Sequence, residues 1–222
     1  MERLIISCGM LCDEIKLVCR GKKQVPKIMM LRRALHETPG ELRKTLQRLI
    51  EEHQNVDEII LTFGLCGNGV VGLKSENTRL ILPKFDDCIS QLLYLPAEGR
   101  KERSKVKKGH MYLTRQWTKD REAVLSQCRD ITNSYKEEAP EILSEIYGAY
   151  TTVTLVDTGA YTMEKVWERA EQIRDYLPVE IEQEQGSTAI LEKIISGAYD
   201  ENFIILNPGE MVEEKMFRFN GR

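Results

Sequence analysis

The sequence predicts an α/β fold with a mostly parallel, Rossmann-like sheet and helices on both of its faces. Strand-like and helix-like segments alternate along the chain, and the strand-like segments are apolar throughout instead of alternating with polar residues. Strands of this kind are buried on both faces, as in a parallel sheet covered by helices. The length of 222 residues suits a single α/β domain or two packed α/β halves with a seam near residues 100–150.

The N-terminal part of the chain begins with a strand and a helix. Arg3–Cys8 is an apolar run that predicts a buried strand, and Cys12–Arg20 follows with an apolar stripe that predicts a helix. A second helix is predicted to begin at Thr38, because Thr, Pro and a Glu three residues after the Thr form a capping box with proline at the first helical position. The apolar stripe of this helix consists of Leu42, Leu46, Leu49 and Ile50.

Strands and helices continue to alternate through the rest of the chain. Val56–Phe63 and Leu80–Pro83 are rich in apolar residues and predict strands, and Cys88–Tyr94 predicts the start of a helix. The remaining predicted elements are, in order, a strand at Met111–Thr114, a helix at Asp120–Cys128, a strand at Thr152–Val156, a helix capped by Thr162, an edge strand at Val179–Gln183, a helix around Ile190–Ile195 and a strand at Phe203–Leu206.

The composition excludes several classes of protein. Hydrophobic residues make up 41% and charged residues 30% of the chain, which is ordinary for a globular protein and not for a disordered one. The net charge of −3 argues against a nucleic-acid or membrane partner, and the apolar runs are far shorter than the ~20 residues of a spanning helix. The N-terminus lacks the apolar core of a signal peptide, so we expect a cytoplasmic protein. The oligomeric state is left open.

One stretch of the chain is strongly basic. Arg100–Lys108 contains six cationic residues and a single acid, Glu102. It is either a solvated loop or a lid that attracts an anion. His110, which follows it, is expected to be structural or solvated.

The six cysteines fall into two groups. A disulfide framework is not expected in a reducing compartment, and Cys19, Cys128 and, less securely, Cys12 are expected to pack in or against helices. Cys8, Cys66 and Cys88 instead follow three different strands, and the carboxyl ends of parallel strands are where α/β proteins bind ligands. Three thiolates at one sheet edge suit zinc with an open position or an iron–sulfur cluster. Small residues tolerated near tight turns are the alternative interpretation.

Two further groups are candidates for binding a small ligand. Gly67, Asn68 and Gly69 are predicted to present backbone N–H groups to an anion as a nest. Asp157 follows a strand, and it either binds a ligand hydroxyl or caps the next helix. The glycine spacing of a dinucleotide loop and the Lys-Ser/Thr of a P-loop are both lacking, which argues against a nucleoside triphosphatase.

Several motifs together resemble one family. The segments that carry the resemblance are Cys8-Gly9 with Glu14, Leu35-His36-Glu37-Thr38-Pro39, Phe63-Gly64-Leu65-Cys66-Gly67-Asn68-Gly69, Pro83-Lys84-Phe85-Asp86-Asp87-Cys88-Ile89 and Met111-Tyr112-Leu113-Thr114. In this order they are similar to the motifs of the domain-of-unknown-function (DUF) 1638 family, over nearly the whole chain.

The resemblance implies a bacterial or archaeal cytoplasmic protein but no defined activity. It adds His36 to the candidate metal ligands and makes Glu14, Asp86 and Asp87 further ligands or groups that orient a ligand. The family usually has His where this chain has Asp86, so Asp86 either replaces that ligand or marks an altered site. Asp87 is also expected to cap the helix that begins at Cys88. Members are often encoded near corrinoid-dependent methyl-transfer genes.

Three functions of different kinds remain open at this point. The first is a metal-dependent enzyme, of methyltransferase type, that acts on a small-molecule substrate or a corrinoid protein in one-carbon metabolism. The second is a carrier or accessory protein for a metal, cluster or corrinoid without turnover of its own. The third is a metal-free domain that binds a small ligand.

Overall fold

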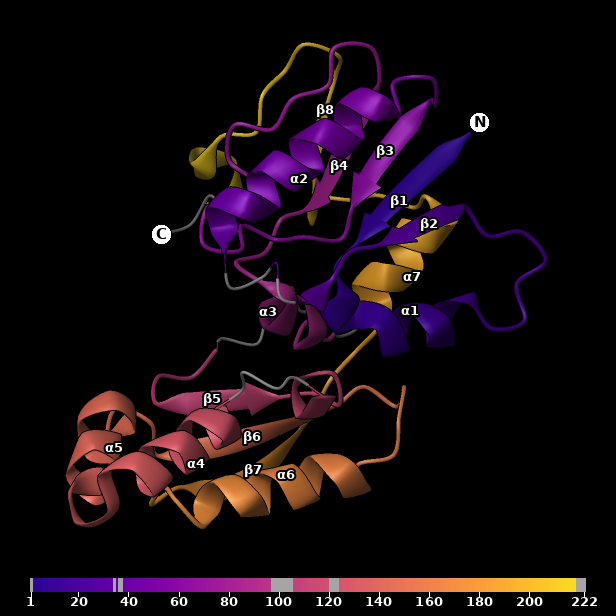
Figure 1. Cartoon of the computed structure of the whole chain (residues 1–222). Coiled ribbons are helices and arrows are strands. Elements are labelled where there is room, and N and C mark those ends of the chain that lie inside the picture. The colour runs from indigo at the N-terminus through magenta and orange to yellow at the C-terminus, as the bar shows by residue number, and fades with distance from the viewer. Residues whose placement is uncertain (1, 34, 36–37, 97–105, 120–123, 219–222) are drawn as a thin grey trace.

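The computed structural model describes residues 2–33, 35, 38–96, 106–119 and 124–218. These residues form two β-sheets, one mostly parallel and one entirely parallel, each with helices packed against it (Figure 1). This confirms the predicted α/β class with mostly parallel strands.

The first sheet has the strand order β2-β1-β3-β4-β8, in which β8 is antiparallel to β4 and the other pairs are parallel. The apolar side chains of β1, β3 and β4 are buried on both faces, as the continuous apolar runs predicted. The strands are β1 (Arg3–Ser7), β2 (Lys27–Met30), β3 (Glu58–Leu61), β4 (Arg79–Pro83) and β8 (Phe203–Leu206).

Four helices accompany the first sheet. The helix α2 lies on one face, and α1 packs with α7 on the other, while α3 follows directly after β4 (Figure 1). Their bounds are α1 (Cys12–Cys19), α2 (Pro39–Glu52), α3 (Cys88–Leu92) and α7 (Ala189–Ser196). The 3₁₀ turns η1 (Gly9–Leu11) and η5 (Glu214–Phe217) also belong to this part of the described chain.

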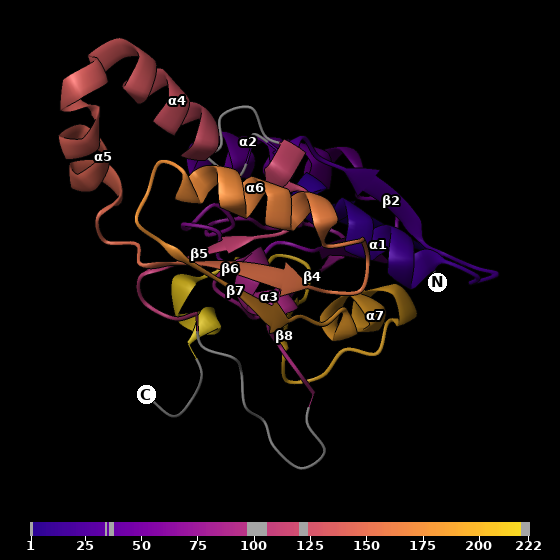
Figure 2. The same ribbon diagram turned by 90° about the horizontal axis from the view of Figure 1, so that it is seen from below.

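The second sheet has the order β5-β6-β7, and one of its faces is covered by a separate apolar core with α4, α5 and α6. The helices α4 and α5 form a hairpin that extends from one end of this sheet (Figure 2). The elements are β5 (His110–Leu113), β6 (Thr152–Asp157), β7 (Glu180–Gln185), α4 (Val124–Tyr135), α5 (Ala139–Tyr147), α6 (Glu164–Arg174), and the 3₁₀ turns η3 (Trp117–Lys119) and η4 (Lys136–Glu138).

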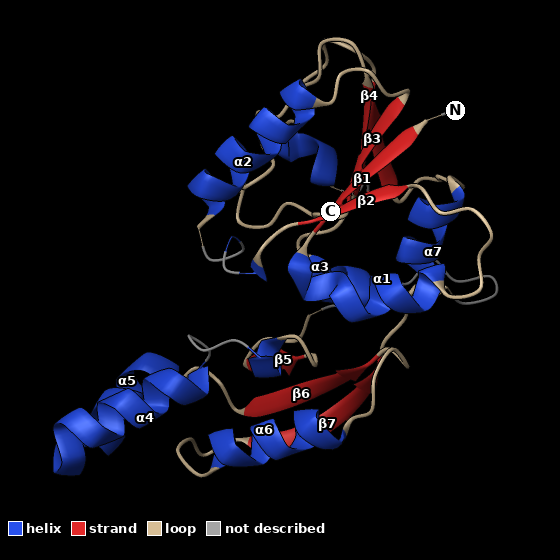
Figure 3. Cartoon of the chain, turned by 45° about the vertical axis from the view of Figure 1, so that its right-hand side comes forward, coloured by secondary structure: helices blue, strands red, loops and turns tan. Residues whose placement is uncertain are grey.

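The two sheets pack together through the face of the second sheet that α4, α5 and α6 do not cover. Tyr112 and Val156 lie on that face and belong to the apolar core of the first sheet. The helices α1 and α3 lie between the two sheets (Figure 3). The chain passes from the first sheet to the second after α3 and returns before α7. These two connecting segments are hydrogen-bonded to each other, because Ser187 N donates to the Leu92 carbonyl at 2.7 Å.

Four details differ from the sequence predictions. The edge strand β2 and the helix α5 were not predicted, although both are well formed. The helix α2 does begin at Pro39, but the side chain of Thr38 makes no capping hydrogen bond in the described part of the chain. The predicted helix at Asp120–Cys128 is instead described from Val124 and runs further, to Tyr135.

All six cysteines are free thiols, as expected for a chain without a disulfide framework. None of the helices formed by the described residues has the length and apolar character needed to cross a lipid bilayer.

Candidate functional site

The candidate site lies where the strand order of the first sheet reverses. The chain passes from β1 to β2 on one side and then to β3 on the other, so β1 and β3 are neighbours with divergent connections. In such sheets a crevice opens beyond the carboxyl ends of these two strands, and ligands bind there. Cys8 directly follows β1, and Cys66 lies in the loop that follows β3.

Cys8 is buried and held between the ends of the two strands. Its backbone N–H donates to Thr62 Oγ1 at 3.0 Å, and the same hydroxyl donates to Ser7 Oγ at 3.1 Å. Its carbonyl accepts the N–H of Leu11 at 3.0 Å, which closes the 3₁₀ turn before α1. The backbone at Cys8 is therefore fixed from both sides.

Cys66 lies in a tight loop against the segment that precedes Cys88. Cys66 N donates to the Asp86 carbonyl at 2.8 Å. A Cβ at Gly64 would stand 2.5 Å from the Phe85 carbonyl oxygen, so only glycine permits this approach of the two loops. Cys66 has φ of +46°, and non-glycine residues in this left-handed region are uncommon and concentrate at functional sites.

The predicted anion nest forms an exposed turn of the same loop. Gly67 and Asn68 continue the left-handed backbone with φ of +61° and +66°. Both are exposed, whereas Gly69 is buried and its N–H donates to the Cys66 carbonyl at 3.1 Å. Arg43 Nη2 donates to the Asn68 carbonyl at 2.6 Å, which ties this turn to α2.

Cys88 is the first residue of α3, and the predicted cap is confirmed. Asp87 Oδ1 accepts the N–H of Ser90 at 2.7 Å, while Ser90 Oγ lies 3.0 Å from Asp87 N, so the two residues form a capping box. The side chain of Asp86 is exposed. The cap explains the position of Asp87 without requiring it to be a ligand.

The three thiols are close enough to interact electrostatically. Burial raises the pKa of Cys8 to about 11, and burial together with the charges of Cys8 and Asp87 raises the pKa of Cys66 to about 12. The pKa of Cys88 is raised well above its ordinary value, first by burial and then by Cys8, Asp87, Cys66 and Glu14. Cys66 and Cys88 nevertheless keep some solvent-accessible surface, so they are not sealed in the core.

Glu14 joins this group from α1. It is fully buried, and its Oε1 accepts the hydroxyl of Thr158 at 3.0 Å. Its Oε2 has no hydrogen-bond partner among the described residues. Burial raises the pKa of Glu14 to about 7, because the charged carboxylate is poorly stabilised there.

Residues that follow β5 of the second sheet contact α1 beside this group, and the sequence did not predict these contacts. Arg115 forms a bidentate ion pair with the buried Asp13, and Gln116 Nε2 donates to the same carboxylate at 2.5 Å. Burial acts to raise the pKa of Asp13, but the hydrogen bonds from Arg115 and Gln116 outweigh it and lower the pKa. The guanidinium also lies 5.6 Å from the ring centroid of Tyr161.

These contacts have no local sequence signal. Arg115 follows Asp13 by 102 residues, and Thr158 follows Glu14 by 144 residues. The buried Gln91 of α3 was also missed, and neither atom of its amide has a partner among the described residues. The one available signal was position, because Thr114–Gln116 and Thr158 follow the carboxyl ends of β5 and β6.

The remaining candidates lie elsewhere or in structural roles. Asp157 Oδ1 accepts Gly159 N at 3.0 Å and its Oδ2 accepts Gln183 Nε2 at 3.1 Å, which stabilises the turn after β6. Cys128 is fully buried in the second core and Cys19 packs against the first, as predicted. His36 lies outside the described residues.

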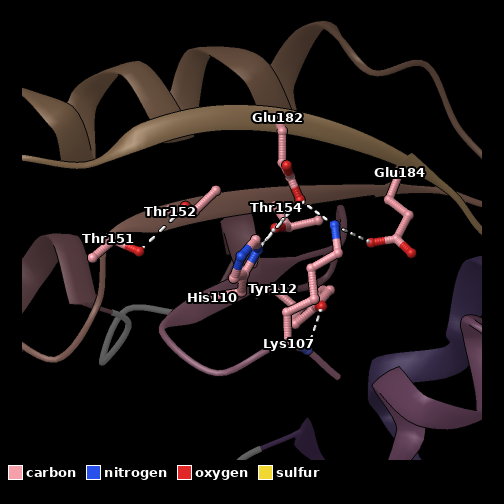
Figure 4. A network of polar contacts seen from close by, with 8 residues as sticks. All are labelled: Lys107, His110, Tyr112, Thr151, Thr152, Thr154, Glu182 and Glu184. Atoms are coloured by element: carbon pink, nitrogen blue, oxygen red, sulfur yellow. Dashed lines mark hydrogen bonds and ion pairs between the residues drawn. The ribbon is translucent and has the colours of Figure 1, made fainter. Parts of the chain in front are cut away.

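His110 takes part in a polar network on β5, β6 and β7 (Figure 4). Its Nδ1 lies 2.8 Å from Thr154 Oγ1 and 3.2 Å from Glu182 Oε1. Lys107, at the end of the basic stretch, pairs with Glu182 at 2.9 Å and with Glu184 at 3.5 Å. Residues 100–105 of that stretch lie outside the described part, so the lid interpretation is not addressed.

The side chains of the cysteine cluster are donor types that bind metals, but their spacing is not that of a metal site. Thiolates with one carboxylate are a donor set that zinc accepts, and three thiolates also suit an iron–sulfur cluster. Within residues 2–33, 35, 38–96, 106–119 and 124–218, however, no three His, Cys, Asp or Glu side chains lie close enough together to hold one metal ion. Ligation would therefore require the side chains to move together.

Comparison with known proteins identified one family. A family model described as "Protein of unknown function (DUF1638)" matches residues 30–195. Neither the curated proteins nor the solved structures gave a match to the chain. The matched range includes the loops of Cys66 and Cys88 and leaves Cys8 and Glu14 outside it.

Proposed function

We propose that this chain, which belongs to the DUF1638 family, binds a metal ion or an iron–sulfur cluster through the thiols of Cys8, Cys66 and Cys88. What supports the proposal is that Cys8, Cys66 and Cys88 each follow a different strand, and that the charges of Cys8 and Cys66 contribute to the raised pKa of Cys88. Glu14 is the proposed oxygen donor, because its Oε2 is buried and without a partner among the described residues.

The raised pKa values of the three thiols mean that they hold their protons when no metal is bound. Burial is the largest cause for each thiol, and the charge of Cys8 adds to it for Cys66 and Cys88. A bound metal ion reverses this effect, because thiolate is the form that ligates and binding releases the protons. A metal held here would supply Lewis-acid activation of a substrate thiol.

We extend the proposal to methyl transfer in one-carbon metabolism. Its support is the family resemblance and the association of that family with corrinoid-dependent genes. A corrinoid would then come with a partner protein. A cytoplasmic location is part of the proposal, since a reducing compartment keeps the free thiols available.

One observation favours the alternative of a metal-free domain that binds a small ligand. The side chains of the described cysteines and carboxylates do not converge to metal-ligand spacing. The same residues would then serve as small groups at tight turns, and the crevice at the end of β1 and β3 would bind the ligand directly.

Metal analysis separates these alternatives. Anaerobically purified wild-type protein is expected to contain near-stoichiometric zinc or iron. Cys8→Ser, Cys66→Ser and Cys88→Ser should lose the metal while the protein stays folded, because serine is a poor substitute for a soft thiolate.

Cys19→Ser and Cys128→Ser are the matched controls and should retain the metal. Metal-free wild-type protein, or loss of metal from Cys128→Ser and not from Cys66→Ser, would overturn the proposed site. Turnover of a methyl donor by the metal-loaded protein would then distinguish an enzyme from a carrier.

A further inference from the structure

A pocket lies at the carboxyl ends of β1 and β2, on the side of β1 that faces away from β3. It has a volume of about 440 Å³ and is lined by Gly9, Cys12, Met30, Leu31, Arg32, Arg33 and Gln116. The lining comes from the carboxyl ends of β1 and β2, from the first residue of α1 and from the loop after β5. This volume is within the range of about 300–1,000 Å³ that small-molecule sites have.

The described lining of the pocket combines positive charge with apolar surface. Its described lining residues include two arginines and no acid, and Met30 and Leu31 supply hydrocarbon surface. Asp13, which follows Cys12 in the sequence, accepts hydrogen bonds from Arg115 and Gln116. A ligand that matches these walls carries a negative head and a short apolar body.

Arg33 is held in place by both halves of the molecule. Its Nη1 donates to Gln116 Oε1 at 3.2 Å, and its Nη2 donates to the Lys119 carbonyl at 3.4 Å. Gly9 permits the close packing on the other side, because a Cβ there would stand 2.5 Å from the Leu31 carbonyl oxygen and 3.0 Å from Arg33 Cγ. The guanidinium is therefore positioned before any ligand arrives, which lowers the entropic cost of binding.

Cys12 places a thiol in the wall of this pocket. It is a free, half-exposed cysteine at the first residue of α1, whereas Cys8 one turn earlier is buried. We propose that the pocket binds a small organic anion, a carboxylate or phosphate ester with a short apolar chain, between Arg32, Arg33 and the thiol of Cys12. This site needs no metal, so it goes beyond the metal centre proposed above.

Alkylation of Cys12 tests the proposal with a reagent that is itself a small carboxylate. Iodoacetate forms a sulfur–carbon bond as the carbon–iodine bond breaks, iodide leaves and the thiol proton passes to solvent. Iodoacetamide gives the same reaction without the negative charge. The full-length protein is treated with each reagent, and modification of Cys12 and Cys19 is followed by peptide mass spectrometry.

The expected result is a preference for iodoacetate at Cys12 that saturates with reagent concentration. The iodoacetate-to-iodoacetamide rate ratio should exceed that at Cys19 about tenfold, as expected from one or two charge-assisted hydrogen bonds. Hexanoate or butyl phosphate should protect Cys12, and hexylammonium should not. Protection by only one of the two anions identifies its head group as the preferred one.

Arg32→Gln should lower the ratio at Cys12 about tenfold. Arg32 is exposed, so its removal does not threaten folding, whereas Arg33→Gln also removes contacts between the halves and is the second variant. Arg48→Gln, on the exposed surface of α2, is the matched control and should leave the ratio unchanged.

Equal ratios at Cys12 and Cys19 with no effect of Arg32→Gln, or protection by hexylammonium as strong as by hexanoate, would overturn the proposal. Neither result bears on the metal content of the cysteine cluster, so the two proposals fail separately.

Discussion

Replacing Glu14 by Gln should stabilise the metal-free protein at neutral and alkaline pH. Glu14 is fully buried, and burial raises its pKa to about 7 from the ordinary value of 4.5. Glutamine keeps the shape and an oxygen that accepts the Thr158 hydroxyl, but it carries no charge at any pH. The variant removes the cost of a buried carboxylate and puts an amide nitrogen at the place of Oε2, a change whose cost is the same at every pH.

The size of the effect follows from the two pKa values. A group with a raised pKa in the folded state contributes stability below its unfolded pKa, and this contribution is lost as pH rises through the folded pKa. The loss should begin near pH 4.5 and be nearly complete above pH 7. It corresponds to about 3 kcal/mol between these limits.

Urea unfolding of chelator-treated wild type and Glu14→Gln at about pH 4 and pH 8 measures this difference. The stability of the variant relative to wild type should increase by about 3 kcal/mol between the two pH values. Glu52→Gln, an exposed control on α2, should show a change below about 0.5 kcal/mol. A relative stability of Glu14→Gln that is the same at both pH values would refute a buried carboxylate with a raised pKa.

Three further substitutions test the contacts around the site by urea unfolding. Asp87→Ala should lower the free energy of unfolding by about 1 kcal/mol, because α3 loses its cap. Gly64→Ala should lower it by about 1–3 kcal/mol, because the new Cβ would meet the Phe85 carbonyl oxygen. Arg115→Ala should lower it by about 3 kcal/mol, because the buried Asp13 loses its partner.

Each of these predictions has a matched control. Asp87→Asn should keep most of the stability, since asparagine also caps helices. Gly40→Ala should be close to neutral, because among the described residues no atom outside its own helix turn and chain neighbours lies within 4 Å of the added Cβ. If Gly64→Ala is as stable as Gly40→Ala, the close approach of the Cys66 and Cys88 loops is wrong. Arg48→Ala removes an exposed ion pair and should cost less than about 1 kcal/mol, and an equal cost for Arg115→Ala would contradict the buried pair.

The parts of the fold that could be predicted are those with a local signal. The strands β1, β4 and β8 are apolar runs that are mostly buried, and the amphipathic stripe of α2 is complete within its own sequence. The strand β2 was missed because it takes its conformation from pairing with β1, in the register Leu4 with Lys27, more than from its own composition.

The same distinction applies to the candidate site. Cys8, Cys66 and Cys88 could be grouped from sequence because the carboxyl ends of parallel strands meet at one edge of a sheet. The ion pair of Asp13 with Arg115 and the bond of Glu14 to Thr158 could not, since they depend on how the second sheet packs against α1.

The contact between Leu92 and Ser187 has a consequence for how this architecture is built. Residues 93–186 leave and re-enter the first sheet at adjacent points, since Ser187 N and the Leu92 carbonyl oxygen are 2.7 Å apart. The second sheet and its helices are therefore arranged as an insertion within a single loop of the first. A gene could gain, exchange or lose this segment by insertion or deletion at one point of the coding sequence, between α3 and α7. The strand order of the first sheet would stay the same.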